Sequence, residues 1–124
     1  MQTILVVDDE VIFLDILQLL LQRAGYRVLT AADGLEAMAL IRSHRPDVVL
    51  LDDMLPGMNG GEICLNIKQD PQLRHIPVIL YSAGARVRDR SFIEHVGADA
   101  VLYKPFKPET VTGVIQDCLN GARA

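Results

Sequence analysis

Five short apolar segments alternate with five helix-like segments, and this alternation restricts the fold of the chain more than any other feature. Strands are expected at residues 3–8, 27–31, 48–52, 77–82 and 100–103. The first, third and fourth are continuous apolar runs rich in β-branched residues, which is typical of strands buried on both faces. Short connections and right-handed crossovers then favour an α/β fold, a doubly wound parallel sheet with helices on both faces.

The segments between these runs have helical spacing and helix-end signals. Helices are expected at residues 12–24, 34–43, 60–69, 88–96 and 108–120. Asp33 is a candidate N-cap for the second helix, and Gly25 stands where the first should stop. The expected apolar stripe of the first helix consists of Phe13, Ile16, Leu17, Leu20 and Ala24.

Length and charge exclude several classes of protein. The chain has 124 residues, and we expect residues 1–124 to be a single domain without an output domain. A net charge of −4 without charge runs argues against direct nucleic-acid binding. No signal peptide and no apolar stretch long enough for membrane insertion are present, so a cytoplasmic location is expected.

Polar residues end four of the five expected strands. The first strand ends in Asp8 and Asp9, the third in Asp52, the fourth in Ser82 and the fifth in Lys104. Since ligands bind at the carboxyl ends of parallel strands, these side chains should gather at one edge of the sheet. The sequence therefore predicts an acidic pocket with a bound cation and a carboxylate available for chemistry.

Four motifs occur in order along the chain. They are VVDDE at 6–10, LLDDMLPGMNG at 50–60, PVILYSAG at 77–84 and GADAVLYKPF at 97–106. Together they resemble the receiver domains of response regulators, the CheY-like domains of two-component signalling, over essentially the whole chain. The resemblance implies a flavodoxin-like (βα)5 fold with a five-stranded parallel sheet of order 2-1-3-4-5.

The resemblance also implies roles for individual residues. Asp52 would be the phosphoacceptor, and Ser82 and Lys104 would contact the phosphoryl group. The implied ligands of a divalent cation, Mg²⁺ or Mn²⁺, are Asp8, Asp9, Asp52 and the backbone carbonyl of Met54, with Asp9 favoured over Asp8 as a direct ligand. A carboxylate is a competent nucleophile toward phosphorus, and a cation that prefers oxygen ligands would bridge the two negative partners.

Two neighbouring features have less specific readings. Asp53 points away from the pocket if Asp52 points into it, because adjacent strand residues face opposite ways. We expect Asp53 to be a solvated acid or a neighbour of the site. Arg86, Arg88 and Arg90 could dock a partner or an anion, but a solvated loop and helix start is the favoured interpretation.

The chain departs from the family pattern at the expected switch. Val101 stands where the family usually has Tyr or Phe, and Tyr103 either substitutes for that ring or is merely an amphipathic edge residue. Ser82 replaces the commoner Thr and keeps the hydroxyl. The family typically has a cis peptide bond before the proline that corresponds to Pro105.

The leading hypothesis is a phosphorylation-activated signalling receiver. The expected phosphodonor is a sensor histidine kinase or a histidine phosphotransfer protein, and the expected output is a downstream protein target or a missing output domain. The chain would not be a classical enzyme, since it would catalyse only its own phosphorylation and dephosphorylation. One alternative is a pseudo-receiver, an interaction module with a vestigial pocket. Another is a Mg²⁺-dependent phosphatase, against which the absence of a second acid at Met54 argues.

Overall fold

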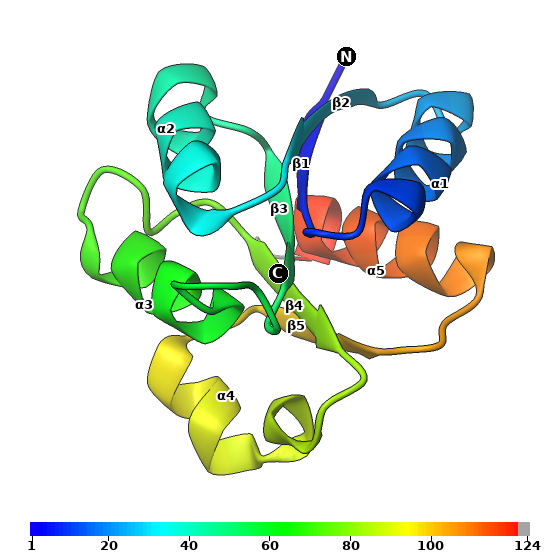
Figure 1. The fold of residues 1–124 in the computed structure, drawn as a ribbon. Coiled ribbons are helices and arrows are strands. Elements are labelled where there is room, and N and C mark those ends of the chain that lie inside the picture. The colour runs from blue at the N-terminus through cyan, green and yellow to red at the C-terminus, as the bar shows by residue number, and fades with distance from the viewer. Residues whose placement is uncertain (122–124) are drawn as a thin grey trace.

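Strands and helices alternate along the whole described chain (Figure 1). The structure is a computed structural model, and it describes residues 1–121. The elements are β1 (Thr3–Val7), α1 (Val11–Arg23), β2 (Arg27–Ala31), α2 (Gly34–His44), β3 (Val48–Asp52), α3 (Gly60–Gln69), β4 (Val78–Ser82), a 3₁₀ turn (Ala85–Arg88), α4 (Arg90–Val96), β5 (Ala100–Tyr103) and α5 (Pro108–Gly121).

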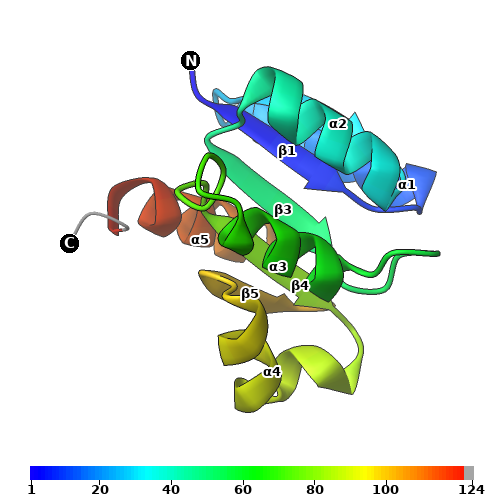
Figure 2. The same cartoon turned by 90° about the vertical axis from the view of Figure 1, so that its left-hand side faces the viewer.

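The strands within residues 1–121 form a five-stranded sheet in the order β2-β1-β3-β4-β5, and every pair is parallel. Figure 2 shows β1, β3, β4 and β5 in this order. This confirms the predicted doubly wound fold. The central strand is β3, which pairs with β1 on one side and β4 on the other. All five residues of β3 are buried, as its continuous apolar run predicts.

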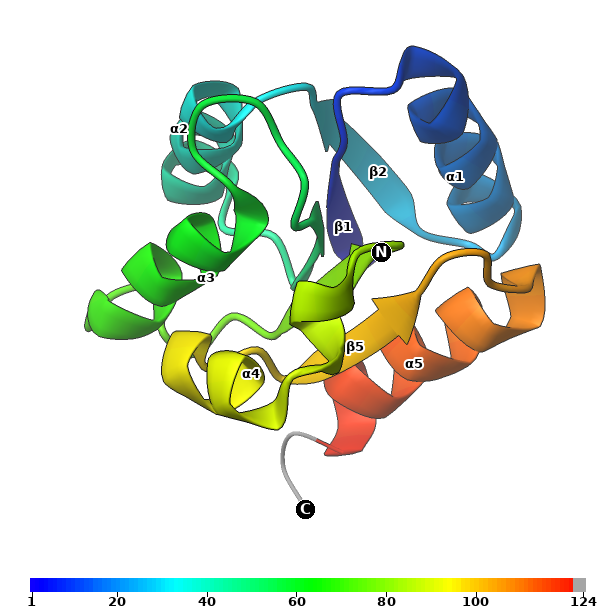
Figure 3. The same ribbon diagram turned by 60° about the horizontal axis from the view of Figure 1, so that its bottom comes forward.

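Helices cover both faces of the sheet. Helices α1 and α5 lie on one face, and α2, α3 and α4 lie on the other (Figures 1 and 3). Each face has its own hydrophobic cluster. On the α1 and α5 side, the buried helical residues are Leu14, Leu17, Leu21, Val111, Ile115 and Cys118.

The predicted stripe of α1 is only partly correct. Leu17 is buried, but Ile16 is 58% exposed, and Leu14 and Leu21 take the buried positions instead. Helix α1 has apolar residues around most of its circumference, so its sequence does not define one face. Within residues 1–121, none of the helices combines the length and apolar character that crossing a membrane requires.

The expected helix at residues 88–96 begins two residues later, at Arg90, and a separate 3₁₀ turn precedes it. Asp89 ends the 3₁₀ turn and caps α4, because its side chain accepts hydrogen bonds from the N–H groups of Ser91 and Phe92. By contrast, Asp33 caps α2 as predicted, accepting from the N–H of Glu36 at 2.8 Å.

Candidate functional site

Three carboxylates meet at the carboxyl end of the sheet. Asp8 follows β1, Asp9 comes next, and Asp52 is the last residue of β3. One oxygen of each lies within 4.8 Å of the others. Asp8 and Asp52 are buried and Asp9 is exposed. This is a set of hard oxygen donors with one side open to water, which fits Mg²⁺ or Mn²⁺.

Lys104 brings the positive charge to this cluster from the end of β5. Its Nζ lies 3.3 Å from Asp8 Oδ2, 3.6 Å from Asp52 Oδ2 and 3.7 Å from Glu10 Oε1. The following peptide bond, Lys104–Pro105, is cis, which is the isomer that the family resemblance implies. This cluster of charged side chains therefore joins residues from the ends of β1, β3 and β5 that are far apart in the sequence.

The two oxygens of Asp52 have different surroundings. Oδ1 accepts a hydrogen bond from the N–H of Met54 at 3.0 Å, and Oδ2 faces the ammonium of Lys104. Burial raises the pKa of Asp52 above its ordinary value, and the nearby charge of Asp8 adds to the rise. The Met54 N–H and Lys104 oppose it by stabilising the ionised form.

Ser82 ends β4 and is 2% exposed. Its Oγ accepts the N–H of Gly84 at 2.9 Å. The hydroxyl hydrogen is not used in that bond, so the group keeps its ability to donate. Gly84 leaves little room above the hydroxyl, because a Cβ at this position would lie 3.3 Å from both Ser82 Oγ and Met54 Sδ.

Tyr81 is a site residue that the sequence reasoning did not identify. It is fully buried in β4, and its hydroxyl donates to Asp8 Oδ2 at 2.8 Å. Burial, with the charge of Asp8 next, raises the pKa of Tyr81, so the phenol keeps its proton. The signal was available in principle, since a phenol inside an apolar strand needs a hydrogen-bond partner when it is buried.

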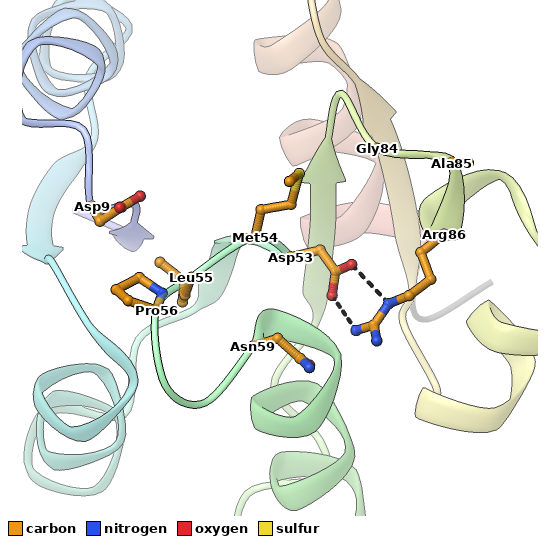
Figure 4. A pocket seen from close by; sticks show the side chains of 9 residues that line it. All are labelled: Asp9, Asp53, Met54, Leu55, Pro56, Asn59, Gly84, Ala85 and Arg86. Atoms are coloured by element: carbon orange, nitrogen blue, oxygen red, sulfur yellow. Dashed lines mark hydrogen bonds and ion pairs between the residues drawn. The ribbon is translucent and has the colours of Figure 1, made fainter.

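Asp53 points to the other side of β3, but it is not solvated. It is 4% exposed, and Oδ1 accepts the N–H of Gly61 at 2.9 Å. The guanidinium of Arg86 binds both oxygens, with Nε 3.1 Å from Oδ2 and Nη2 2.9 Å from Oδ1 (Figure 4). The same guanidinium lies 4.2 Å from the centroid of the Phe92 ring. Asp53 is therefore the buried neighbour of the site, not the solvated acid of the other reading, and Arg86 stays 47% exposed while its guanidinium binds this carboxylate.

This ion pair forms one wall of an open pocket of about 510 Å³ beside the carboxylates (Figure 4). The pocket lies between the loops that follow β1, β3 and β4. Its lining residues are Asp9, Asp53, Met54, Leu55, Pro56, Asn59, Gly84, Ala85 and Arg86. Asp9 belongs both to this lining and to the group of three carboxylates, so the pocket opens directly beside that group.

The start of α3 packs directly against the backbone at the end of β3. The N–H of Gly60 donates to the carbonyl of Asp53 at 3.0 Å. A Cβ at Gly60 would overlap the carbonyl oxygen of Asp52 and lie 2.7 Å from the Cα of Asp53. Glycine is therefore required where α3 begins, because the helix starts directly against the residues that carry the two acids.

The two candidate switch residues differ in exposure. Val101 is half-buried against the cluster on the α2, α3 and α4 face. Tyr103 is 40% exposed, and the guanidinium of Arg88 lies 4.1 Å from its ring centroid. The structure thus gives Tyr103 a partner in the turn that follows β4, and its role as a switch stays a prediction.

Comparison with known proteins identifies relatives across almost the full chain. The family model described as the response regulator receiver domain matches residues 4–116. The chain is 37% identical over 117 residues to the alkaline phosphatase synthesis transcriptional regulatory protein PhoP of Bacillus subtilis, covering 94% of this chain and 48% of PhoP. It is 34% identical over 121 residues to the polar-differentiation response regulator DivK of Brucella anthropi, covering 98% of both. The chain thus spans about half the length of PhoP and nearly all of DivK.

A solved structure with the same fold carries a metal in its cleft. It is the receiver domain of a sensor histidine kinase from Pseudomonas aeruginosa, with a magnesium ion coordinated in the active-site cleft. The TM-score is 0.86 at 30% sequence identity, and the match covers 95% of this chain and 97% of that one.

Proposed function

This chain belongs to the response regulator receiver family, and on that premise we propose that Asp52 accepts a phosphoryl group in a reaction that depends on Mg²⁺ or Mn²⁺. Members of the family are signalling modules. The observation that carries the proposal is the convergence of Asp8, Asp9, Asp52 and Lys104 from the ends of three strands. A carboxylate nucleophile, an acidic cation site and a mobile ammonium are the groups that transfer to an aspartate requires.

The proposed transfer uses these groups as follows. An oxygen of Asp52 forms a bond to phosphorus while the bond between phosphorus and the donor imidazole nitrogen breaks, and that nitrogen keeps the electron pair. Lys104 then contacts the phosphoryl oxygens, and the Ser82 hydroxyl donates to one of them. The product is an aspartyl phosphate, whose added charge biases the domain toward a second conformation.

The residues present fit a divalent cation. Asp8, Asp9, Asp52 and the Met54 carbonyl would hold it, and Asp9 is the exposed member through which water reaches the site. When bound, the cation neutralises the negative charge that accumulates as phosphate meets carboxylate. The Pseudomonas receiver domain supports this assignment, because its cleft coordinates magnesium.

The proposed phosphodonor is a sensor histidine kinase or a histidine phosphotransfer protein in the cytoplasm. The partner that reads the phosphorylated form would be a downstream protein or an output domain. These assignments follow from family membership. The pseudo-receiver alternative predicts that the pocket binds no phosphoryl group, so one experiment separates the two functions.

The experiment is intact-mass spectrometry after incubation with acetyl phosphate, with Mg²⁺ or with EDTA. Wild type should gain a single phosphoryl adduct only with Mg²⁺, and Asp52→Ala should gain none. Asp53→Asn is the matched control, since Asp53 faces the Arg86 side of the strand, and it should still be modified.

Two results would contradict the proposal. An adduct that persists in Asp52→Ala would place the modification elsewhere. Failure of wild type to be phosphorylated, both by acetyl phosphate and by a histidine kinase, would favour the pseudo-receiver.

A further inference from the structure

Tyr81 is buried directly beside the acidic cluster of Asp8, Asp9 and Asp52. It is fully buried, and its ring lies 5.8 Å from that of Phe13 and 5.9 Å from that of Phe106, centroid to centroid. Its hydroxyl lies 2.8 Å from Asp8 Oδ2 and 3.2 Å from the carbonyl oxygen of Val7. A phenol has one hydrogen to donate, and the shorter contact is the one to Asp8.

The Asp8 carboxylate depends on three partners. Oδ1 accepts the N–H of Glu10 at 2.9 Å. Oδ2 accepts from Tyr81 and also from Lys104, whose Nζ is 3.3 Å away. Asp8 is fully buried, and a buried charge is tolerated only when it is paired and hydrogen-bonded.

One of these partners is not permanent. Lys104 also lies 3.6 Å from Asp52 Oδ2, and the proposed function moves its ammonium onto the phosphoryl group. The backbone N–H of Glu10 and the Tyr81 hydroxyl then remain on Asp8. Of the two, only the hydroxyl contacts Oδ2, so it is the protein group that still orients that oxygen.

The same ring also borders the ammonium. Lys104 Nζ lies 4.4 Å from the centroid of the Phe13 ring and 5.0 Å from that of Tyr81. Aromatic faces attract cations at such distances. The ring of Tyr81 therefore helps to position the Lys104 ammonium, while the Tyr81 hydroxyl donates a hydrogen bond to Asp8.

We infer that Tyr81 is a positioning residue for the divalent cation, acting through its hydroxyl bond to the Asp8 carboxylate. The inference rests on the proposed function, because it takes Asp8 as part of the cation site. Groups that orient a metal-binding carboxylate restrict its rotation before the ion arrives. Loss of such a group typically lowers metal affinity by about 10-fold or more.

The test is the Kd for Mg²⁺ of the unphosphorylated protein, measured by isothermal titration calorimetry. Tyr81→Phe keeps the ring and removes only the hydroxyl, and we expect its Kd to rise by about 10-fold. Tyr103→Phe is the matched control, because Tyr103 is exposed on the next strand, and its Kd should equal that of wild type.

A second measurement needs no variant at Tyr81. Tyrosines labelled with ¹³C at Cζ are followed by NMR during a Mg²⁺ titration of wild type. The Tyr81 signal should shift with the calorimetric Kd, and the signals of Tyr26 and Tyr103 should not.

The outcomes separate the two levels of the argument. Wild type that binds no Mg²⁺ would overturn the proposed cation site and this inference with it. Wild type that binds while Tyr81→Phe binds equally well or more tightly would overturn the inference alone. A Tyr81 signal that stays unchanged at saturating Mg²⁺ would do the same.

Discussion

The side chains of Asp52 and Asp53 leave the end of β3 in opposite directions. Asp52 Oδ2 lies 3.6 Å from Lys104 Nζ. The two oxygens of Asp53 accept hydrogen bonds from Nε and Nη2 of Arg86. Both carboxylates are 4% exposed, so burial does not distinguish them. Their partners do. Asp53 is bound by an arginine and a backbone N–H and serves the fold, whereas Asp52 has one oxygen directed at the Lys104 ammonium, which a phosphoryl group could also contact.

Replacing Asp52 with Asn should stabilise the metal-free protein at neutral pH. Burial raises the pKa of Asp52 in the folded state above its ordinary value of 3.8. The protonated form therefore favours folding, and that contribution is complete below 3.8 and is lost as the pH rises through the raised folded pKa. Above it, the ionised carboxylate weakens the fold. Asn is neutral and can still accept the Met54 N–H.

The measurement is the melting temperature in EDTA. At pH 7 Asp52→Asn should melt a few degrees above wild type, at roughly 4 °C per kcal/mol for a chain of this size. The gain should shrink as the pH falls toward 3, where wild-type Asp52 is also protonated. Asp15→Asn, an exposed acid of α1, is the control and should show no gain. A lower melting temperature for Asp52→Asn at pH 7 would contradict the argument.

At the scale of elements, Arg86 joins three segments that are separate in the sequence. It reaches from the 3₁₀ turn to Asp53 at the end of β3, and it stacks on Phe92 of α4. Asp53 in turn accepts the N–H of Gly61 in the first turn of α3. The segment between β4 and α4 is thus tied to the strand that carries the phosphoacceptor candidate.

Removing this tie should lower stability. Arg86→Ala leaves the buried Asp53 carboxylate without its cation, which costs about 3–5 kcal/mol in a fully buried pair. The Arg86 side chain is 47% exposed, so screening reduces this to about 1–3 kcal/mol. Urea unfolding measures it. Arg88→Ala, in the same turn, removes an exposed arginine whose contact is the Tyr103 ring, and it should cost at most about 0.5–1 kcal/mol.

If Arg86→Ala and Arg88→Ala lower the free energy of unfolding equally, the ion pair between Arg86 and Asp53 does not stabilise the fold as argued. Asp53→Asn is informative as well. It keeps an oxygen for the Gly61 N–H and loses the charge, so it should be less damaging than Arg86→Ala, because no uncompensated carboxylate remains buried.

For the whole molecule, the sequence was sufficient for the architecture and insufficient for parts of the site. The strand at 48–52 is predicted with its observed bounds, because a buried parallel strand is short and continuous in apolar residues. The bounds of the edge strand at 100–103 also agree, although only Leu102 of it is buried. The meeting of Asp8, Asp52 and Lys104 followed from topology alone. The buried face of helix α1 was predicted only in part, since Ile16 and Leu14 are equally apolar and nothing local selects between them.

The sequence did not predict which side chains bind each other across long sequence separations. Arg86 and Asp53 are 33 residues apart, and three arginines in one short segment give no indication of which one is bound. Tyr81 and Asp8 are 73 residues apart. Such pairs are set by register between strands and by the path of the loop after β4, which depend on the packed structure rather than on a local pattern.

The central position of β3 has a consequence for isotope exchange. Strand β3 pairs with β1 on one side and β4 on the other, and helices cover both of its faces. Its backbone amides should therefore take up deuterium only when the whole domain unfolds. Exchange in β3 would then report global stability, with or without phosphate on Asp52. The 3₁₀ turn and α4 pack against the sheet on one side only, through residues such as Val87 and Val96, so we expect them to open locally at a lower free energy than β3. Any exchange difference between the two phosphorylation states that exceeds the change in global stability should therefore be found there.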